Sequence, residues 1–129
     1  MRKNGFIVLL IFLAAGVQAS AQAKLAVGSI CLAYWEPNGY YFVATVVEES
    51  PEAKDSYRVI FADGDQAVVP AARVRPFDVG AGTKIWAKWS DGRFYSGTVA
   101  RITGWALFIE FDDGDKGWTS WAGIAVKHE

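Results

Sequence analysis

The chain has 129 residues and a formal net charge of −1, and 52% of its residues are hydrophobic. This length accommodates one ordinary domain or two very small ones. The slightly acidic balance argues against binding nucleic acid through phosphates, which requires clustered Lys and Arg, and is compatible with a cationic ligand.

The N-terminal segment has the pattern of a secretory signal peptide. Arg2 and Lys3 precede the apolar run 6–17, which is followed by a small-residue region ending at Ala23. We expect cleavage after Ala23, with Ala19 as the alternative. A membrane anchor is disfavoured because the run is shorter than the ~20 apolar residues that span a bilayer. We therefore predict a signal peptide at 1–23 and a secreted or periplasmic protein with no membrane span. Its removal changes the net charge from −1 to −3.

The single cysteine, Cys31, lies in an alternating apolar segment. One thiol cannot form an internal disulfide, even in the oxidising compartment that export implies. We expect Cys31 to be a small buried hydrophobic residue.

An internal repeat organises the rest of the chain. The matching blocks are, in order, 28–35 with 82–89, 38–42 with 91–95, 44–46 with 97–99, and 61–65 with 111–115. Pro76 and two glycines mark a linker at 76–82. The predicted domains are residues 24–77 and 78–129. Each is small enough to be marginal alone, so packing between them is expected to matter.

Each half is predicted to form several short strands. Tight turns are expected at Asn38-Gly39 and Asp91-Gly92, because Asn and Gly tolerate positive φ. No sustained helical periodicity follows Ala23. The predicted strands are 43–47, 57–61, one opening at 68–69 and 74–77 in the first half, and 98–102, 107–111, one opening at 118–119 and 124–127 in the second. Short helical turns are predicted at 70–73 and 120–123. This pattern predicts an all-β fold of two tandem five-stranded SH3-like barrels.

The second half carries a motif of moderate specificity. Residues 87–97 read AKWSDGRFYSG, and residues 109–114 read IEFDDG. These segments resemble the Tudor family, especially the tandem Tudor modules of chromatin and DNA-damage readers, and are related to the Agenet group. The resemblance covers residues 27–129. It implies two Tudor-type barrels and an aromatic cage that binds methylated lysine or arginine.

The resemblance also implies which residues form the cage. In the second half they are Trp89, Tyr95, Phe111 and Asp113. In the first half the matching residues are Trp35, Phe42, Phe61 and Asp63. Where some members place a further aromatic residue after Asp-Gly, this chain has Asp115 and Asp65. The alternative for all these aromatic residues is packing in the core or at the barrel rim.

Cage chemistry follows from the residue types alone. A methylated ammonium is bulky, cationic and weakly hydrated, and aromatic faces attract it by ~0.5–2 kcal/mol per ring. A carboxylate adds Coulombic attraction and accepts a hydrogen bond from any remaining N–H. The other tryptophans are expected in the core or at an interface, with Trp118 as an alternative cage wall. They are Trp86, Trp105, Trp118 and Trp121.

Catalysis has little support in the sequence. The single histidine, His128, is next to last, and no nucleophile–base pair, phosphate loop or metal-ligand spacing is evident. The acidic 112–115 segment has no Glu at the position that an EF-hand requires. We therefore predict a non-enzymatic binding protein without metal or cofactor, whose partner is a methylated peptide or a small cationic ligand. The alternative is an SH3-like adaptor that binds a peptide or a cell-envelope polymer, and a purely structural role in an assembly is a third possibility.

Overall fold

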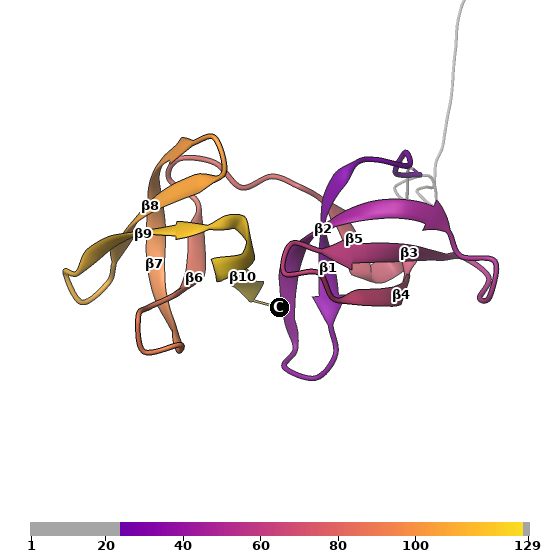
Figure 1. The fold of residues 1–129 in the computed structure, drawn as a ribbon, viewed down its shortest axis with the longest axis horizontal. Coiled ribbons are helices and arrows are strands. Elements are labelled where there is room, and N and C mark those ends of the chain that lie inside the picture. The colour runs from indigo at the N-terminus through magenta and orange to yellow at the C-terminus, as the bar shows by residue number, and fades with distance from the viewer. Residues whose placement is uncertain (1–23, 128–129) are drawn as a thin grey trace, which may run out of the picture.

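A computed structural model describes residues 24–127, which form an all-β protein (Figure 1). The predicted signal peptide and His128 lie outside the described residues. The strands are β1 (Ile30–Trp35), β2 (Tyr40–Glu49), β3 (Ser56–Phe61), β4 (Gln66–Pro70), β5 (Val74–Pro76), β6 (Lys84–Lys88), β7 (Phe94–Thr103), β8 (Ala106–Phe111), β9 (Lys116–Ser120) and β10 (Ile124–Lys127). Two single 3₁₀ turns, η2 (Ala71–Arg73) and η3 (Trp121–Gly123), are the helical segments of this part of the chain.

The ten strands fall into two groups with the same antiparallel pairing order. We call β1–β5 the first repeat and β6–β10 the second repeat. The order is β5-β1-β2-β3-β4 in the first and β10-β6-β7-β8-β9 in the second. Even the irregularities match, because β2 is bulged between Val46 and Glu48 and β7 between Val99 and Arg101. The sequence repeat is therefore a structural repeat.

Local sequence explains most of the strand boundaries. The turns after β1 and before β7 contain Gly39 at φ 78° and Gly92 at φ 83°, the positive values predicted for them. Gly64 and Gly114 have φ 99° and 98° and reverse the chain after β3 and β8. The fourth strands begin two residues earlier than predicted, at Gln66 and Lys116.

The two repeats share one continuous sheet. Strand β10 pairs with β6 on one edge and with residues 40–42 of β2 on the other. Aromatic residues add contacts across the junction: the rings of Tyr40 and Trp86 stack with centroids 6.0 Å apart, and those of Phe77 and Trp121 meet edge to face at 4.8 Å. Packing between the halves, expected from their small size, is thus extensive.

The hydrophobic core has two clusters that do not divide strictly by repeat. One consists of first-repeat residues around Val46 and Val59. The other, around Leu107 and Ile109, also includes Leu32, Tyr41 and Val43 from the first repeat. Cys31 is fully buried, as predicted, and burial raises the pKa of its thiol to about 11. No helix among residues 24–127 has the length and apolar character needed to cross a membrane.

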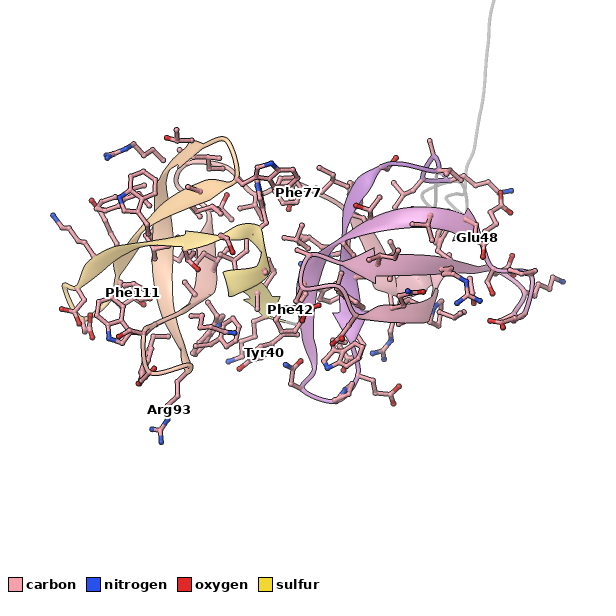
Figure 2. The ribbon with its side chains drawn as sticks, in the orientation of Figure 1. Tyr40, Phe42, Glu48, Phe77, Arg93 and Phe111 are labelled. Atoms are coloured by element: carbon pink, nitrogen blue, oxygen red, sulfur yellow. The ribbon has the colours of Figure 1, made fainter. Side chains whose placement is uncertain are left out.

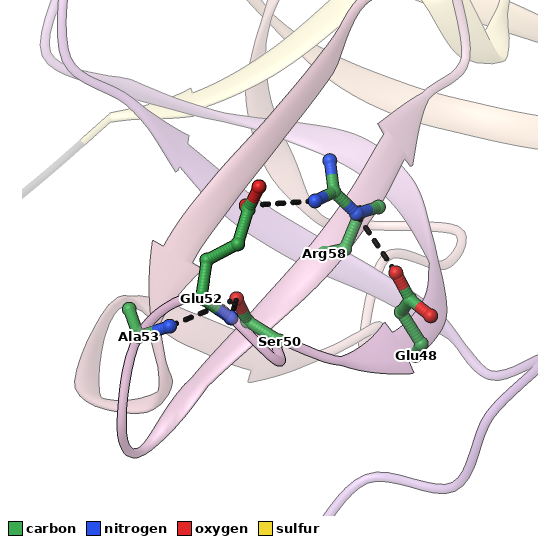
Figure 3. Close-up of polar contacts among 5 residues, drawn as sticks. All are labelled: Glu48, Ser50, Glu52, Ala53 and Arg58. Carbon is green, nitrogen blue, oxygen red and sulfur yellow. Dashed lines mark hydrogen bonds and ion pairs between the residues drawn. The ribbon is translucent and has the colours of Figure 1, made fainter.

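The outer faces of the two repeats differ at equivalent positions. In the first repeat Arg58 donates hydrogen bonds to Glu48 and Glu52, at 2.9 and 2.7 Å (Figure 3). In the second repeat the residue paired across β7 and β8 with Arg101 is Phe108, and the Arg101 guanidinium lies 4.8 Å from its ring centroid. Exposed ion pairs contribute little to stability, so this face of the first repeat is held mainly by the core beneath it.

Candidate functional site

The four residues predicted for the second repeat line a single pocket of about 200 Å³. We call it the second-repeat pocket. Its lining residues are Trp89, Asp91, Tyr95, Phe111, Asp113 and Asp115. Trp89 follows β6, Tyr95 lies near the start of β7, and Phe111 ends β8. Because β6, β7 and β8 are neighbours in the sheet, these strand ends meet at one edge of the repeat, where Figure 2 shows Phe111.

The aromatic rings of this pocket form a corner. The Trp89 and Phe111 rings meet edge to face, with centroids 5.2 Å apart and planes at 85°. Phe111 is 7% exposed and belongs to the core, whereas Tyr95 is 38% exposed. A β-carbon at Gly117 would lie 3.3 Å from the Trp89 ring, so glycine there leaves room for the indole. Phe111 therefore forms the floor of the pocket, and Trp89 and Tyr95 form its sides.

Three carboxylates complete the second-repeat pocket. Asp113 and Asp91 each accept a hydrogen bond from a backbone N–H two residues on, at 2.9 Å, which fixes them in their turns. The second oxygen of Asp91 accepts a 2.6 Å hydrogen bond from the Tyr95 hydroxyl. This bond, with the Arg93 N–H bond, lowers the pKa of Asp91, and the same bond raises the pKa of Tyr95. The pocket thus presents negative charge beside aromatic faces.

The Asp91–Tyr95 hydrogen bond gives a direct prediction. In Asp91→Asn, the pKa of Tyr95 should fall toward its ordinary value, because the charged acceptor that holds the phenolic proton is gone. An alkaline titration of tyrosinate absorbance, taken as a difference between variant and wild type, measures this change. Tyr95→Phe identifies the transition by removing it. An unchanged tyrosine titration in Asp91→Asn would contradict the hydrogen bond.

The four residues predicted for the first repeat also line one pocket, of about 190 Å³. Its rings repeat the corner seen in the second repeat: those of Trp35 and Phe61 meet edge to face at 5.3 Å and 81°. Phe42 and Asp63 are also in its lining. Figure 2 shows Phe42 at the junction between the repeats, so this pocket lies where the two repeats meet. We call it the inter-repeat pocket.

The second repeat supplies part of the inter-repeat pocket. Lys88, Phe94 and Trp121 are in its lining. The Phe94 ring meets Phe42 edge to face at 6.0 Å, and the Lys88 Nζ lies 5.7 Å from the Phe94 centroid. Sequence reasoning missed these residues and also missed Asp91. The spacing of Asp91 from Tyr95 across a tight turn was a usable signal for Asp91, whereas no local pattern indicated the other three.

The expected core or interface role of the tryptophans is wrong for Trp118. It is 52% exposed, and its ring packs on Phe108, at 5.0 Å, with the Arg101 guanidinium 5.1 Å from its centroid. The alternation of β9 points Gly117 inward and Trp118 outward. Trp118 is therefore neither a core residue nor part of the second-repeat pocket lining. Trp105 is not a core residue either, because it is 73% exposed, and it contacts Trp121 edge to face at 6.2 Å.

The lining of the second-repeat pocket has the residue types that attract a cation. It offers aromatic faces and carboxylates to a bound group. Within residues 24–127 no three His, Cys, Asp or Glu side chains form a group able to hold a metal ion.

The fold places the chain among tandem Tudor structures. The crystal structure of the Crb2 tandem Tudor domains matches 81% of this chain and 81% of its own, with a TM-score of 0.56 and 14% sequence identity. The fold is therefore a tandem Tudor fold.

Sequence comparison gives a shorter match. Over 64 residues the chain is 38% identical to metal-response element-binding transcription factor 2 of Mus musculus, and equally to that of Homo sapiens. The match covers 48% of this chain and 10% of either relative, so the chain spans about a tenth of their length. No protein-family model matches the chain.

Proposed function

We propose that the chain is a methyl-mark binding module whose second-repeat pocket holds a methylated lysine, a methylated arginine or a similar quaternary-ammonium group. The observation that carries this proposal is the meeting of three aromatic rings and three carboxylates in one open pocket whose lining contains no cation. Three rings at about 1 kcal/mol each contribute about 3 kcal/mol to binding. Weak but selective affinity for the isolated group is expected.

The composition of the pocket indicates which ligands it prefers. Asp115 stands where a further aromatic wall would close the cage, so one side is acidic and exposed. Carboxylates accept hydrogen bonds from an ammonium that keeps an N–H, and they attract any cation. The ligand is thus proposed to be a methylated side chain of a peptide or a small cation.

The division of the chain into two barrels is also part of this proposal. Residues 24–77 and 78–129 are proposed as two five-stranded SH3-like barrels of the Tudor type. Export through a signal peptide at 1–23, to a secreted or periplasmic location, stays a prediction from the N-terminal residues. An exported module would meet methylated side chains or choline-like head groups outside the cytoplasm.

Titration of the intrinsic tryptophan fluorescence tests the binding proposal. Trimethyl-lysine, dimethyl-arginine and choline should each give a saturable change, because Trp89 lines the pocket. Unmodified lysine should bind more weakly, because its ammonium is strongly hydrated and costs more to desolvate. Equal binding of lysine and trimethyl-lysine, or no response to any ligand, would overturn the proposal.

A second candidate function is an adaptor that binds an apolar peptide without cage chemistry. It is favoured by a groove of about 280 Å³ between the repeats, lined by Ile30, Ile60, Trp105 and Trp121 among others. Ile30, Thr45 and Ile60 lie in register across β1, β2 and β3, and both isoleucines are exposed. A response to apolar peptides in the absence of any response to methylated ligands would favour this function.

A further inference from the structure

The two aromatic pockets are built alike but carry different charges. Their Trp–Phe corners agree within 0.1 Å and 4° between centroids and planes, at 5.3 Å and 81° against 5.2 Å and 85°. Their volumes, about 190 and 200 Å³, are also alike. Ring geometry alone would therefore predict two equivalent cation sites.

Charge separates the two pockets. The charged residues lining the second-repeat pocket are the carboxylates Asp91, Asp113 and Asp115, and Arg93 lies outside this lining although it interacts with Asp91 and Tyr95. The inter-repeat pocket is lined by two carboxylate residues, Asp63 and Asp65, and by the exposed residue Lys88. A lysine is thus in the lining of one of the two aromatic pockets and no basic residue is in the lining of the other.

The fold holds Lys88 at that position. It ends β6 directly opposite Phe94 on β7, and its Nζ lies 5.7 Å from the centroid of that ring. Phe94 in turn contacts Phe42 of the first repeat. The continuous sheet through β6, β10 and β2 fixes β6 relative to the first repeat. A second-repeat residue therefore completes a pocket whose other charged residues come from the first.

In the first repeat, the residue equivalent to Lys88 is Tyr34, which is not a basic residue. Tyr34 pairs with Tyr41 across β1 and β2, just as Lys88 pairs with Phe94 across β6 and β7. It does not line the second-repeat pocket. The difference in charge between the two pocket linings thus comes from the residue at the Lys88/Tyr34 position and from the pairing of β10 with β2, which joins the repeats.

We propose that Lys88 is a specificity-determining residue that excludes cationic ligands from the inter-repeat pocket, so that each chain binds one methylated ammonium group, in the second-repeat pocket. This inference rests on the proposed function. A second cation entering the inter-repeat pocket would lie within several ångströms of the Lys88 ammonium. Like charges at about 6 Å oppose each other enough to weaken binding about threefold when water screens them fully, and more where the pocket excludes water.

Removal of the Lys88 charge tests the inference, with trimethyl-lysine as the probe in isothermal titration calorimetry. Wild type should bind one equivalent. Lys88→Thr should bind two, with affinity at the inter-repeat pocket raised about threefold or more. Lys88→Arg, which keeps the charge, should bind one. Lys84→Thr, on an exposed position of the same strand and outside both pocket linings, is the matched control and should also bind one.

A double variant separates this inference from the proposed function. Trp89→Ala should not bind the probe, whereas Trp89→Ala with Lys88→Thr should bind one equivalent at the inter-repeat pocket. If wild type binds and this double variant, folded by circular dichroism, does not, the role of Lys88 is wrong and the proposed function stands. If only variants carrying Lys88→Thr bind, the role of Lys88 stands and the proposed function is wrong. If no protein binds, both are overturned.

Discussion

Replacing Trp89 with Ala is expected to remove measurable binding of a trimethylammonium ligand while leaving the fold intact. The indole is half-buried, forms one side of the second-repeat pocket and stands at 85° to the Phe111 ring. Loss of its face costs about 1–2 kcal/mol of cation–π attraction, which weakens an already weak affinity about five- to thirtyfold. Fluorescence titration and calorimetry measure the loss.

Trp118→Ala is the matched control for this prediction. Trp118 is 52% exposed and lies outside the pocket lining, so its removal should leave ligand affinity unchanged. If Trp89→Ala loses its circular dichroism signal, Tyr95→Ala replaces it, because the Tyr95 side chain is more exposed than that of Trp89. Wild-type affinity in a folded Trp89→Ala protein would contradict the aromatic cage.

Replacing Ala125 with Pro is expected to disrupt the pairing of β10 with β2 and β6, which connects the repeats, and to lower the free energy of unfolding by about 3 kcal/mol. Ala125 lies in β10 between Phe42 of β2 and Trp86 of β6, and it is 1% exposed. Proline removes a backbone donor from a strand that is paired on both edges, and its ring has no room there. A urea unfolding curve measures the loss.

Ala125→Gly is the control for the proline variant. It removes the methyl group but keeps the backbone N–H, so a smaller loss of about 1 kcal/mol is expected. The natural sequence shows where proline is tolerated: Pro76 ends β5, whose partner in the described sheet is β1 alone. Equal unfolding midpoints for the proline and glycine variants would show that β10 does not join the repeats as described.

Features encoded over short stretches were predictable from the sequence. The repeat, the Asp-Gly turns and the all-β fold follow from alternation and turn chemistry. Within each repeat, the candidate pocket residues stand at the ends of strands that are neighbours in chain order, as Trp89, Tyr95 and Phe111 do. Their convergence needs only the pairing of consecutive strands, which turns enforce. The ligand-binding role of these residues stays a prediction.

Features that depend on contacts between distant segments were decided by the tertiary structure. The pairing of β10 with β2 joins residues 83 to 87 positions apart, and no local pattern specifies it. That pairing brings Lys88, Phe94 and Trp121 to a pocket whose other residues belong to the first repeat. The exposure of Trp118 likewise follows from which face of β9 the core covers.

The amino-acid sequence by itself determined two aromatic corners of the same kind, because each is assembled from consecutive strands and tight turns. Only the packing of one repeat against the other decided that they differ, since it brings a lysine to the lining of one pocket while the lining of the other has carboxylates as its charged residues. Charge acts through space, so its effect on a pocket depends on which distant residue the fold brings near.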